Sequence, residues 1–148
     1  LSSCLKVEVL PDEPVITFES LQTYPDSAVM IIGFQDGDGD VGLDQGDTLS
    51  PYQLDGQFYF NLLCDYSELQ NGEWVTFTDL ETPFYYRVPR VTPTGQNPTL
   101  TGEMRVLFPP LYYIPNTGFD TCRFSIQLYD RSLNLSNSVN SRSFLKPL

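Results

Sequence analysis

The chain has 148 residues, 41% of them hydrophobic, with 19 acidic and 8 basic residues and no histidine. The net charge of −11, without any cluster of lysines and arginines, argues against nucleic acid as a partner. The lack of histidine excludes Ser-His and Cys-His dyads and histidine-ligated zinc or iron. A chain of this length can bury a core of its own without disulfides.

The first four residues, Leu1-Ser2-Ser3-Cys4, match the pattern of a bacterial lipobox, in which cleavage before the cysteine frees it for lipidation. We therefore expect a signal segment upstream, a lipid on Cys4 and a membrane as partner. Residues 1–13 would be the lipobox remnant and a short tether. The alternative is an ordinary strand-end sequence.

Residues 14–148 alternate strand-like runs with turn signals, and helical periodicity of the apolar residues is weak throughout. Asn71-Gly72 is a strong hairpin signal. The pattern predicts one all-β domain, an immunoglobulin or fibronectin type III-like β-sandwich of seven to eight antiparallel strands. Strands are expected at 15–20, 27–34, 57–66, 73–78, 84–88, 100–108, 121–130 and 137–144.

The stretch DGDGDVGLDQGD, residues 36–47, places five aspartates at positions 1, 3, 5, 9 and 12 of a calcium loop of the EF-hand type. These residues are Asp36, Asp38, Asp40, Asp44 and Asp47. The carbonyl of Gly42, at position 7, is a further expected ligand. Carboxylates this close repel one another, so a cation among them would stabilise the loop. The sequence therefore predicts a structural calcium site.

The loop departs from an EF-hand in two ways. Val41 stands at position 6, where the sharp turn needs glycine, and Asp47 replaces the bidentate glutamate at position 12. The flanking runs favour strands rather than helices. A metal-free Asx-turn loop, rich in aspartate and glycine, is the alternative interpretation.

The predicted topology gives this loop a neighbour. If 27–34, 57–66, 121–130 and 137–144 are strands B, C, F and G, the B–C and F–G loops share one end of the sandwich. Asp130 could then supply another oxygen to the metal, or instead bond to the backbone of its own loop.

Cys64 and Cys122 form the remaining pair of cysteines once Cys4 is set aside. A bridge between strands C and F is possible in an exported protein. Both cysteines alternate with apolar residues, which favours two buried thiols.

Aromatic residues offer a second functional hypothesis, a sugar-stacking platform. Adjacent pairs must point to opposite faces of a strand, so only half of them can enter one core. Packing in the core and on strand faces is the alternative. The candidate platform residues are Trp74, Tyr85, Tyr86, Tyr112 and Tyr113.

Nearly the whole chain resembles the small, mostly uncharacterised lipoproteins of the Bacteroidetes, and the aspartate loop is the specific part of the resemblance. The resemblance is carried by Leu1 to Cys4, by residues 34–44 and 93–95, and by LYDRSLNLSN at 128–137, which is similar to the closing strand of bacterial Ig-like domains. It implies an Ig-like domain on a lipid anchor in the cell envelope, at the outer membrane. Leu5-Lys6-Val7-Glu8 has one acid and so departs from an acidic surface-export signal, leaving the periplasmic and surface sides open.

These features lead to three functional hypotheses. The first is a non-enzymatic, calcium-stabilised, lipid-anchored binding or scaffolding domain, whose partner could be a glycan or a protein. The second is a carbohydrate-binding module of a polysaccharide-uptake system. The third is a calcium-dependent hydrolase, for which a small sandwich without histidine offers little catalytic machinery.

Overall fold

The computed structural model describes residues 10–91 and 99–148, and these fold into strands and loops without a helix. The proposed lipobox, Leu1 to Cys4, lies outside the described residues. The strands are β1 (Val15–Tyr24), β2 (Ser27–Asp36), β3 (Leu62–Gln70), β4 (Glu73–Thr76), β5 (Phe84–Tyr86), β6 (Leu100–Phe108), β7 (Thr121–Leu128), β8 (Val139–Asn140) and β9 (Phe144–Leu145).

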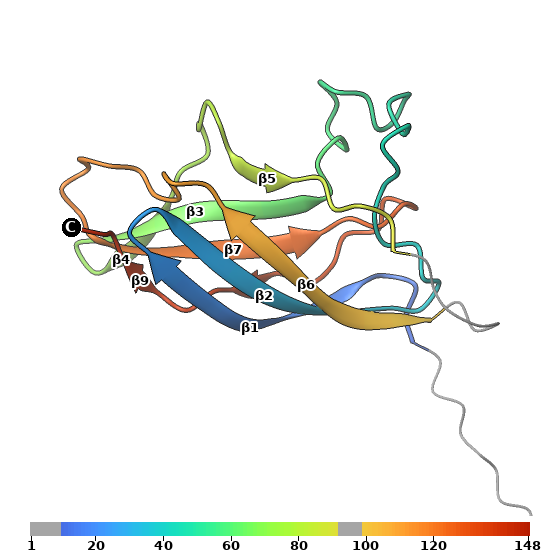
Figure 1. Ribbon diagram of the computed structural model, residues 1–148, viewed down its shortest axis with the longest axis horizontal. Helices are drawn as coiled ribbons and strands as arrows, with labels where there is room; N and C mark the ends of the chain where they lie inside the picture. The colour runs from blue at the N-terminus through green and yellow to red at the C-terminus, as the bar shows by residue number, and fades with distance from the viewer. Residues whose placement is uncertain (1–9, 92–98) are drawn as a thin grey trace, which may run out of the picture.

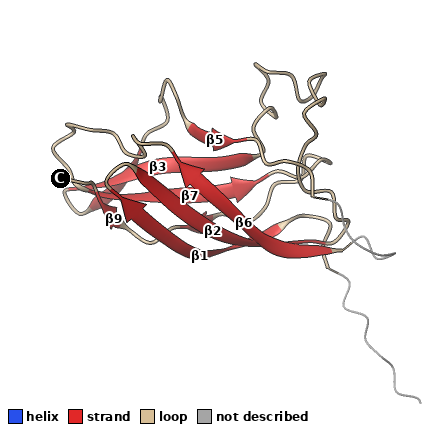
Figure 2. Cartoon of the chain, viewed as in Figure 1, coloured by secondary structure: helices blue, strands red, loops and turns tan. Residues whose placement is uncertain are grey.

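Two antiparallel sheets face each other in a β-sandwich (Figures 1 and 2). One sheet has the order β1-β2-β6, and the other has the order β4-β3-β7-β8, with β5 also paired to β3 and β9 to β7. Of the five long strands, the first, second and fourth (β1, β2 and β6) thus lie in one layer and the third and fifth (β3 and β7) in the other, as expected for an immunoglobulin-like fold. The predicted fold class is confirmed.

The core fills the space between the two sheets. Alternate residues of β2 and β7 point inward, among them Met30, Ile32, Phe124 and Ile126, and all four are fully buried. At one end of the core the buried carboxylate of Glu68 is paired with Lys146 at 2.9 Å. Burying the apolar side chains supplies the main driving force for folding.

The predicted hairpin turn is confirmed, whereas some of the predicted strand bounds are wrong. Asn71 and Gly72, with φ of +53° and +84°, form the predicted hairpin between β3 and β4. β3 begins at Leu62 rather than at residue 57, because residues 49–59 make successive tight turns. The run 137–144 forms only the two short strands β8 and β9.

The pairing of β3 with β7 decides the question of the disulfide. Cys64 lies opposite Ile126, and Cys122 lies opposite Glu68. The two cysteines are therefore four residues apart along the ladder, about 13 Å, which is too far for a bridge. Both are buried free thiols, as the alternation of apolar residues favours.

The two edges of the three-stranded sheet differ. Along β1, the side chain of Asn137 bonds to both backbone groups of Ile16, and Arg142 Nε donates to the carbonyl of Leu21. β6, on the opposite edge, pairs only with β2 within the described part of the chain. Side chains from the segments on either side of β8 therefore cap one edge of this sheet.

Candidate metal centre

Asp36 is the last residue of β2 and is fully buried. It lies on the inward face of the strand, in alternation with Phe34 and Ile32. The chain then turns back at once, since the N–H of Asp40 donates to Asp36 Oδ2 at 3.0 Å and Gly39 has a φ of +67°. The strand alternation thus places a carboxylate at the end of the core, where an uncompensated charge is costly.

Asp130 reaches the same place from the other sheet. It follows β7, two residues beyond the inward-pointing Leu128, and is 3% exposed. Asn134 donates to it twice, through its backbone N–H at 2.8 Å and its side-chain Nδ2 at 3.0 Å. An isolated antiparallel bridge joins Asp130 to Val41. The two loops therefore share one end of the sandwich, as predicted from the topology.

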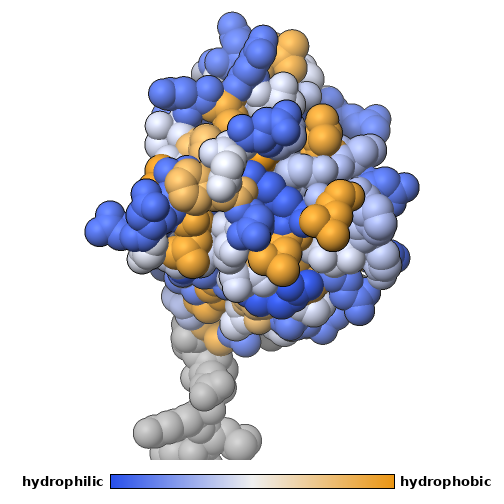
Figure 3. Space-filling view, turned by 90° about the vertical axis from the view of Figure 1, so that its left-hand side faces the viewer, coloured by the Kyte–Doolittle hydropathy of each residue, from blue (hydrophilic) through white to orange (hydrophobic). Residues whose placement is uncertain are grey.

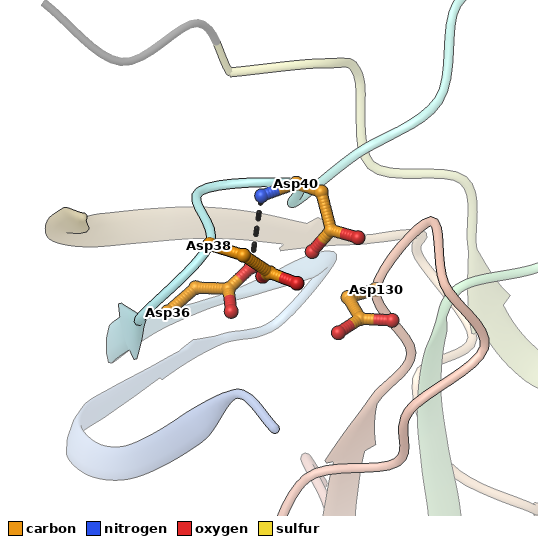
Figure 4. Close-up of side chains that lie close together, drawn as sticks. All are labelled: Asp36, Asp38, Asp40 and Asp130. Carbon is orange, nitrogen blue, oxygen red and sulfur yellow. Dashed lines mark hydrogen bonds between the residues drawn. The ribbon is translucent and has the colours of Figure 1, made fainter. Parts of the chain in front are cut away.

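Four carboxylates converge there, those of Asp36, Asp38, Asp40 and Asp130 (Figure 4). Each offers an oxygen within 4.8 Å of the others. One oxygen each of Asp36, Asp38 and Asp40 is buried without a hydrogen-bond partner. Among the described residues, no lysine or arginine forms an ion pair with any of the four. Such a cluster lacks the positive charge that would compensate it.

The pKa shifts reflect this crowding. Burial, together with the adjacent carboxyls of Asp40 and Asp38, raises the pKa of Asp36 to about 8. Burial also raises the pKa of Asp38, and it raises that of Asp130 to about 6 despite the bonds from Asn134. For Asp40, burial is outweighed by hydrogen bonds with Ser132, Asp36 and Asp38, which together lower its pKa. Without a cation, the cluster therefore favours holding a proton.

Asp44 and Asp47 do not join this cluster, which corrects the EF-hand assignment. Asp44 pairs with Arg90 at 3.2 Å, and Asp47 pairs with Arg131 at 2.6 Å. The reason is the course of the backbone after Asp40: Val41 and Leu43 bridge to other segments instead of curling around an ion.

Gly42 has a packing role. With a φ of +94°, it lies so close to the segment after β5 that a Cβ would meet the carbonyl oxygen of Pro89 at 2.1 Å. Backbone bonds on either side, from Leu43 to Val88 and from Val91 to Val41, hold the two segments together. The predicted carbonyl ligand at Gly42 stays a prediction.

Three arginines hold the long connection between β2 and β3, and the sequence did not reveal them. Arg87 donates to the carbonyl oxygens of Asp44 and Asp47, while Arg90 and Arg131 bind the side chains of the same two residues. These three arginines are far apart in the chain from their partners, so sequence spacing alone gives no signal of the pairing.

The predicted aromatic platform is divided by the fold. Tyr112 is fully buried and donates to the carbonyl of Tyr24, and Trp74 stacks under the guanidinium of Arg123 on the second sheet. Tyr85, Tyr86 and Tyr113 do come together, in an apolar groove of about 630 Å³ that is shared with the prolines at 83, 109, 110 and 115. Only these three of the five can serve one ligand.

The chain matches no protein-family model, no curated protein and no solved structure. Within the described residues, no helix is long and apolar enough to cross a membrane. Figure 3 views the end of the sandwich away from the carboxylate cluster, where apolar side chains are scattered among polar ones.

Proposed function

We propose that the domain binds calcium between its two sheets and that the ion is structural. The observation that carries this proposal is the set of three buried carboxylate oxygens that have no donor, in a cluster drawn from both sheets. A cation held by Asp36 and Asp130 would tie β2 to β7 at this end of the sandwich. It would also neutralise the repulsion among the four acids.

The donor set supports calcium over other metals. All four side chains offer hard carboxylate oxygens, and no nitrogen or sulfur ligand is part of the cluster. Zinc prefers histidine and cysteine, and magnesium holds several waters in a strict octahedron. Calcium accepts six to eight oxygens in flexible geometry, so backbone carbonyls and water can complete its shell.

A thermal melt in calcium and in chelator tests this function. Binding only to the native state raises the melting temperature, by about 2.7 kcal/mol of stability at a hundredfold excess over the dissociation constant. The double variant Asp38→Asn with Asp40→Asn should lose the rise, and Asp55→Asn, an exposed aspartate on the same connection, should keep it. No rise at millimolar calcium would refute the metal site.

We further propose that the domain is a lipid-anchored binding or scaffolding module of the cell envelope. This rests on the resemblance of Leu1 to Cys4 to a lipobox and on the Ig-like fold. The first described residues enter beside the carboxylate cluster, where the N–H of Gly37 donates to the carbonyl of Pro11. A short tether would therefore hold the calcium end toward the membrane. Expression with a native leader, followed by fractionation, should find the chain in membranes and the Cys4→Ala variant released.

Carbohydrate binding is the second candidate, favoured by the groove that gathers Tyr85, Tyr86 and Tyr113. Tyrosine rings provide the flat surfaces on which sugar rings stack. A glycan array should then show a ligand that Tyr113→Ala loses and Trp74→Ala, outside the groove, retains. The groove shares no lining residue with the carboxylate cluster, so it gives no support to a calcium-dependent hydrolase.

A further inference from the structure

The outer edge of β6 is an unused hydrogen-bonding surface within the described part of the chain. The strand is nine residues long and pairs with β2 along its whole length, from Leu100 opposite Asp36 to Phe108 opposite Ala28. No described side chain bonds to its backbone, whereas Asn137 and Arg142 bond to the backbone of β1. An unpaired edge is a template for another strand.

The exposed face of β6 carries opposite charges two residues apart. Glu103 and Arg105 both point to solvent, and neither forms an ion pair with another described residue. Leu107, further along the same face, is 65% exposed. This edge therefore offers one acid, one base and one apolar side chain in a row.

Glu103 also has an unfavourable neighbour. Gly33 lies in β2, opposite Glu103 of β6. Because Gly33 has no side chain, the carboxylate of Glu19 on β1 can lie over it, and a Cβ on Gly33 would be only 2.6 Å from Glu19 Oε1. The hydrogen bond and the charge of Glu103 raise the pKa of Glu19. Glu19 and Glu103 thus lie close together, and no described lysine or arginine forms an ion pair with either of them.

We propose that two copies of this chain associate through β6, antiparallel and centred on Met104. In that register Glu103 of each copy faces Arg105 of its partner, and Leu107 faces Thr101. The two three-stranded sheets become one sheet of six strands. Two symmetric ion pairs form, and each brings a guanidinium toward the Glu19 and Glu103 carboxylates.

The charges select this register over its alternatives. A shift of the centre to Glu103 would place the two Glu103 side chains opposite each other, and a shift to Arg105 would do the same for the two arginines. Like charges directly opposite are destabilising on a sheet, and opposite charges stabilise it. The edge is therefore self-complementary in one antiparallel arrangement, as a two-fold interface requires.

Sedimentation equilibrium of the full chain over a range of concentrations tests the proposal. The native chain should dimerise reversibly, more weakly at high salt. Arg105→Glu should weaken association by roughly tenfold or more, and adding Glu103→Arg to it should restore association by reversing the pairs. Arg123→Glu, on the other sheet, makes the same change of net charge and should have no effect.

Two results would overturn the proposal. One is a native chain that stays monomeric up to millimolar concentration. The other is a dimer that Arg105→Glu leaves intact or that the double swap fails to restore, since association would then use another surface. Far-UV circular dichroism and the melting temperature of each variant separate lost association from lost folding.

Discussion

Asp36 and Asp130 are 94 residues apart in the sequence, yet their carboxylates meet within 4.8 Å at one end of the sandwich. Each is the buried continuation of an inward strand face, one from each sheet. The site is therefore a product of the closed fold rather than of the aspartate loop alone.

Replacing Asp130 with asparagine should weaken calcium binding although the loop sequence is untouched. The variant removes one of four negative charges and keeps the side-chain volume. We expect the dissociation constant to rise by roughly tenfold or more, about 1.4 kcal/mol per factor of ten. Titration calorimetry would measure it, with Asp55→Asn as the control. Unchanged affinity would remove Asp130 from the site.

Asp36→Asn should change stability in opposite directions with and without the ion. In chelator the variant removes a fully buried carboxylate from a cluster of like charges, so the melting temperature should rise above that of the native chain. In calcium the native chain should be the more stable of the two. A variant that is less stable in both conditions would mean that the cluster is satisfied without a metal.

Replacing Arg131 with alanine should increase local opening of the connection between β2 and β3 more than it lowers the global free energy of unfolding. Its bond to Asp47 is 2.6 Å long, and the two side chains are only 25% and 21% exposed. We expect Arg131→Ala to cost about 1–2 kcal/mol and to speed hydrogen exchange in residues 44–60. Arg90→Ala, at a more exposed pair, is the matched control with a smaller effect.

Acid should destabilise the domain through Glu68. Burial alone would raise the pKa of Glu68, but hydrogen bonds from Lys146, Thr117 and Tyr66 outweigh burial and lower it below 4.5. Because the folded pKa is the lower one, this stabilisation is present above about pH 4.5 and is lost as the pH falls below that value. Urea melts should show a smaller decline between pH 5 and 3 for Glu68→Gln.

That variant should also lower stability at pH 7, by about 3 kcal/mol, because it leaves Lys146 without its buried partner. Lys146→Met with Glu68→Gln should recover part of this loss. Equal acid sensitivity of the native chain and of Glu68→Gln would assign the acid effect to other carboxylates.

The two buried thiols should not respond to redox conditions. Cys64 and Cys122 lie four residues apart along the β3–β7 ladder, and burial raises the pKa of both thiols. We expect equal melting temperatures with and without reductant, and alkylation of both cysteines only in denaturant. Alkylation of either one in the native state would contradict this packing.

Much of the fold could be predicted because its signals are local. Strand alternation and the Asn71-Gly72 turn depend on neighbouring residues, and the sandwich follows from the number and spacing of the strands. The start of β3 and the splitting of 137–144 into β8 and β9 depend on partners elsewhere in the chain. Those bounds were wrong for that reason.

The candidate metal site could likewise be predicted only in part. The spacing of Asp36, Asp38 and Asp40 identified the part of the loop that turns back on itself, and the topology supplied Asp130. EF-hand spacing failed beyond Asp40 because it assumes a loop wrapped around an ion between helices. Here Val41 bridges to Asp130 and Leu43 to Pro89, so the backbone pairs with other segments where the motif requires it to wrap around an ion.

The capped edge of β1 has a consequence for assembly. Asn137 and Arg142 occupy backbone groups of Ile16 and Leu21, to which a further strand would bond on that side. A sheet with a single open border can join one copy of itself and then has no border left. Growth would end at a closed pair, and the chain would be protected from the fibrous stacking to which a sheet with two open borders is exposed.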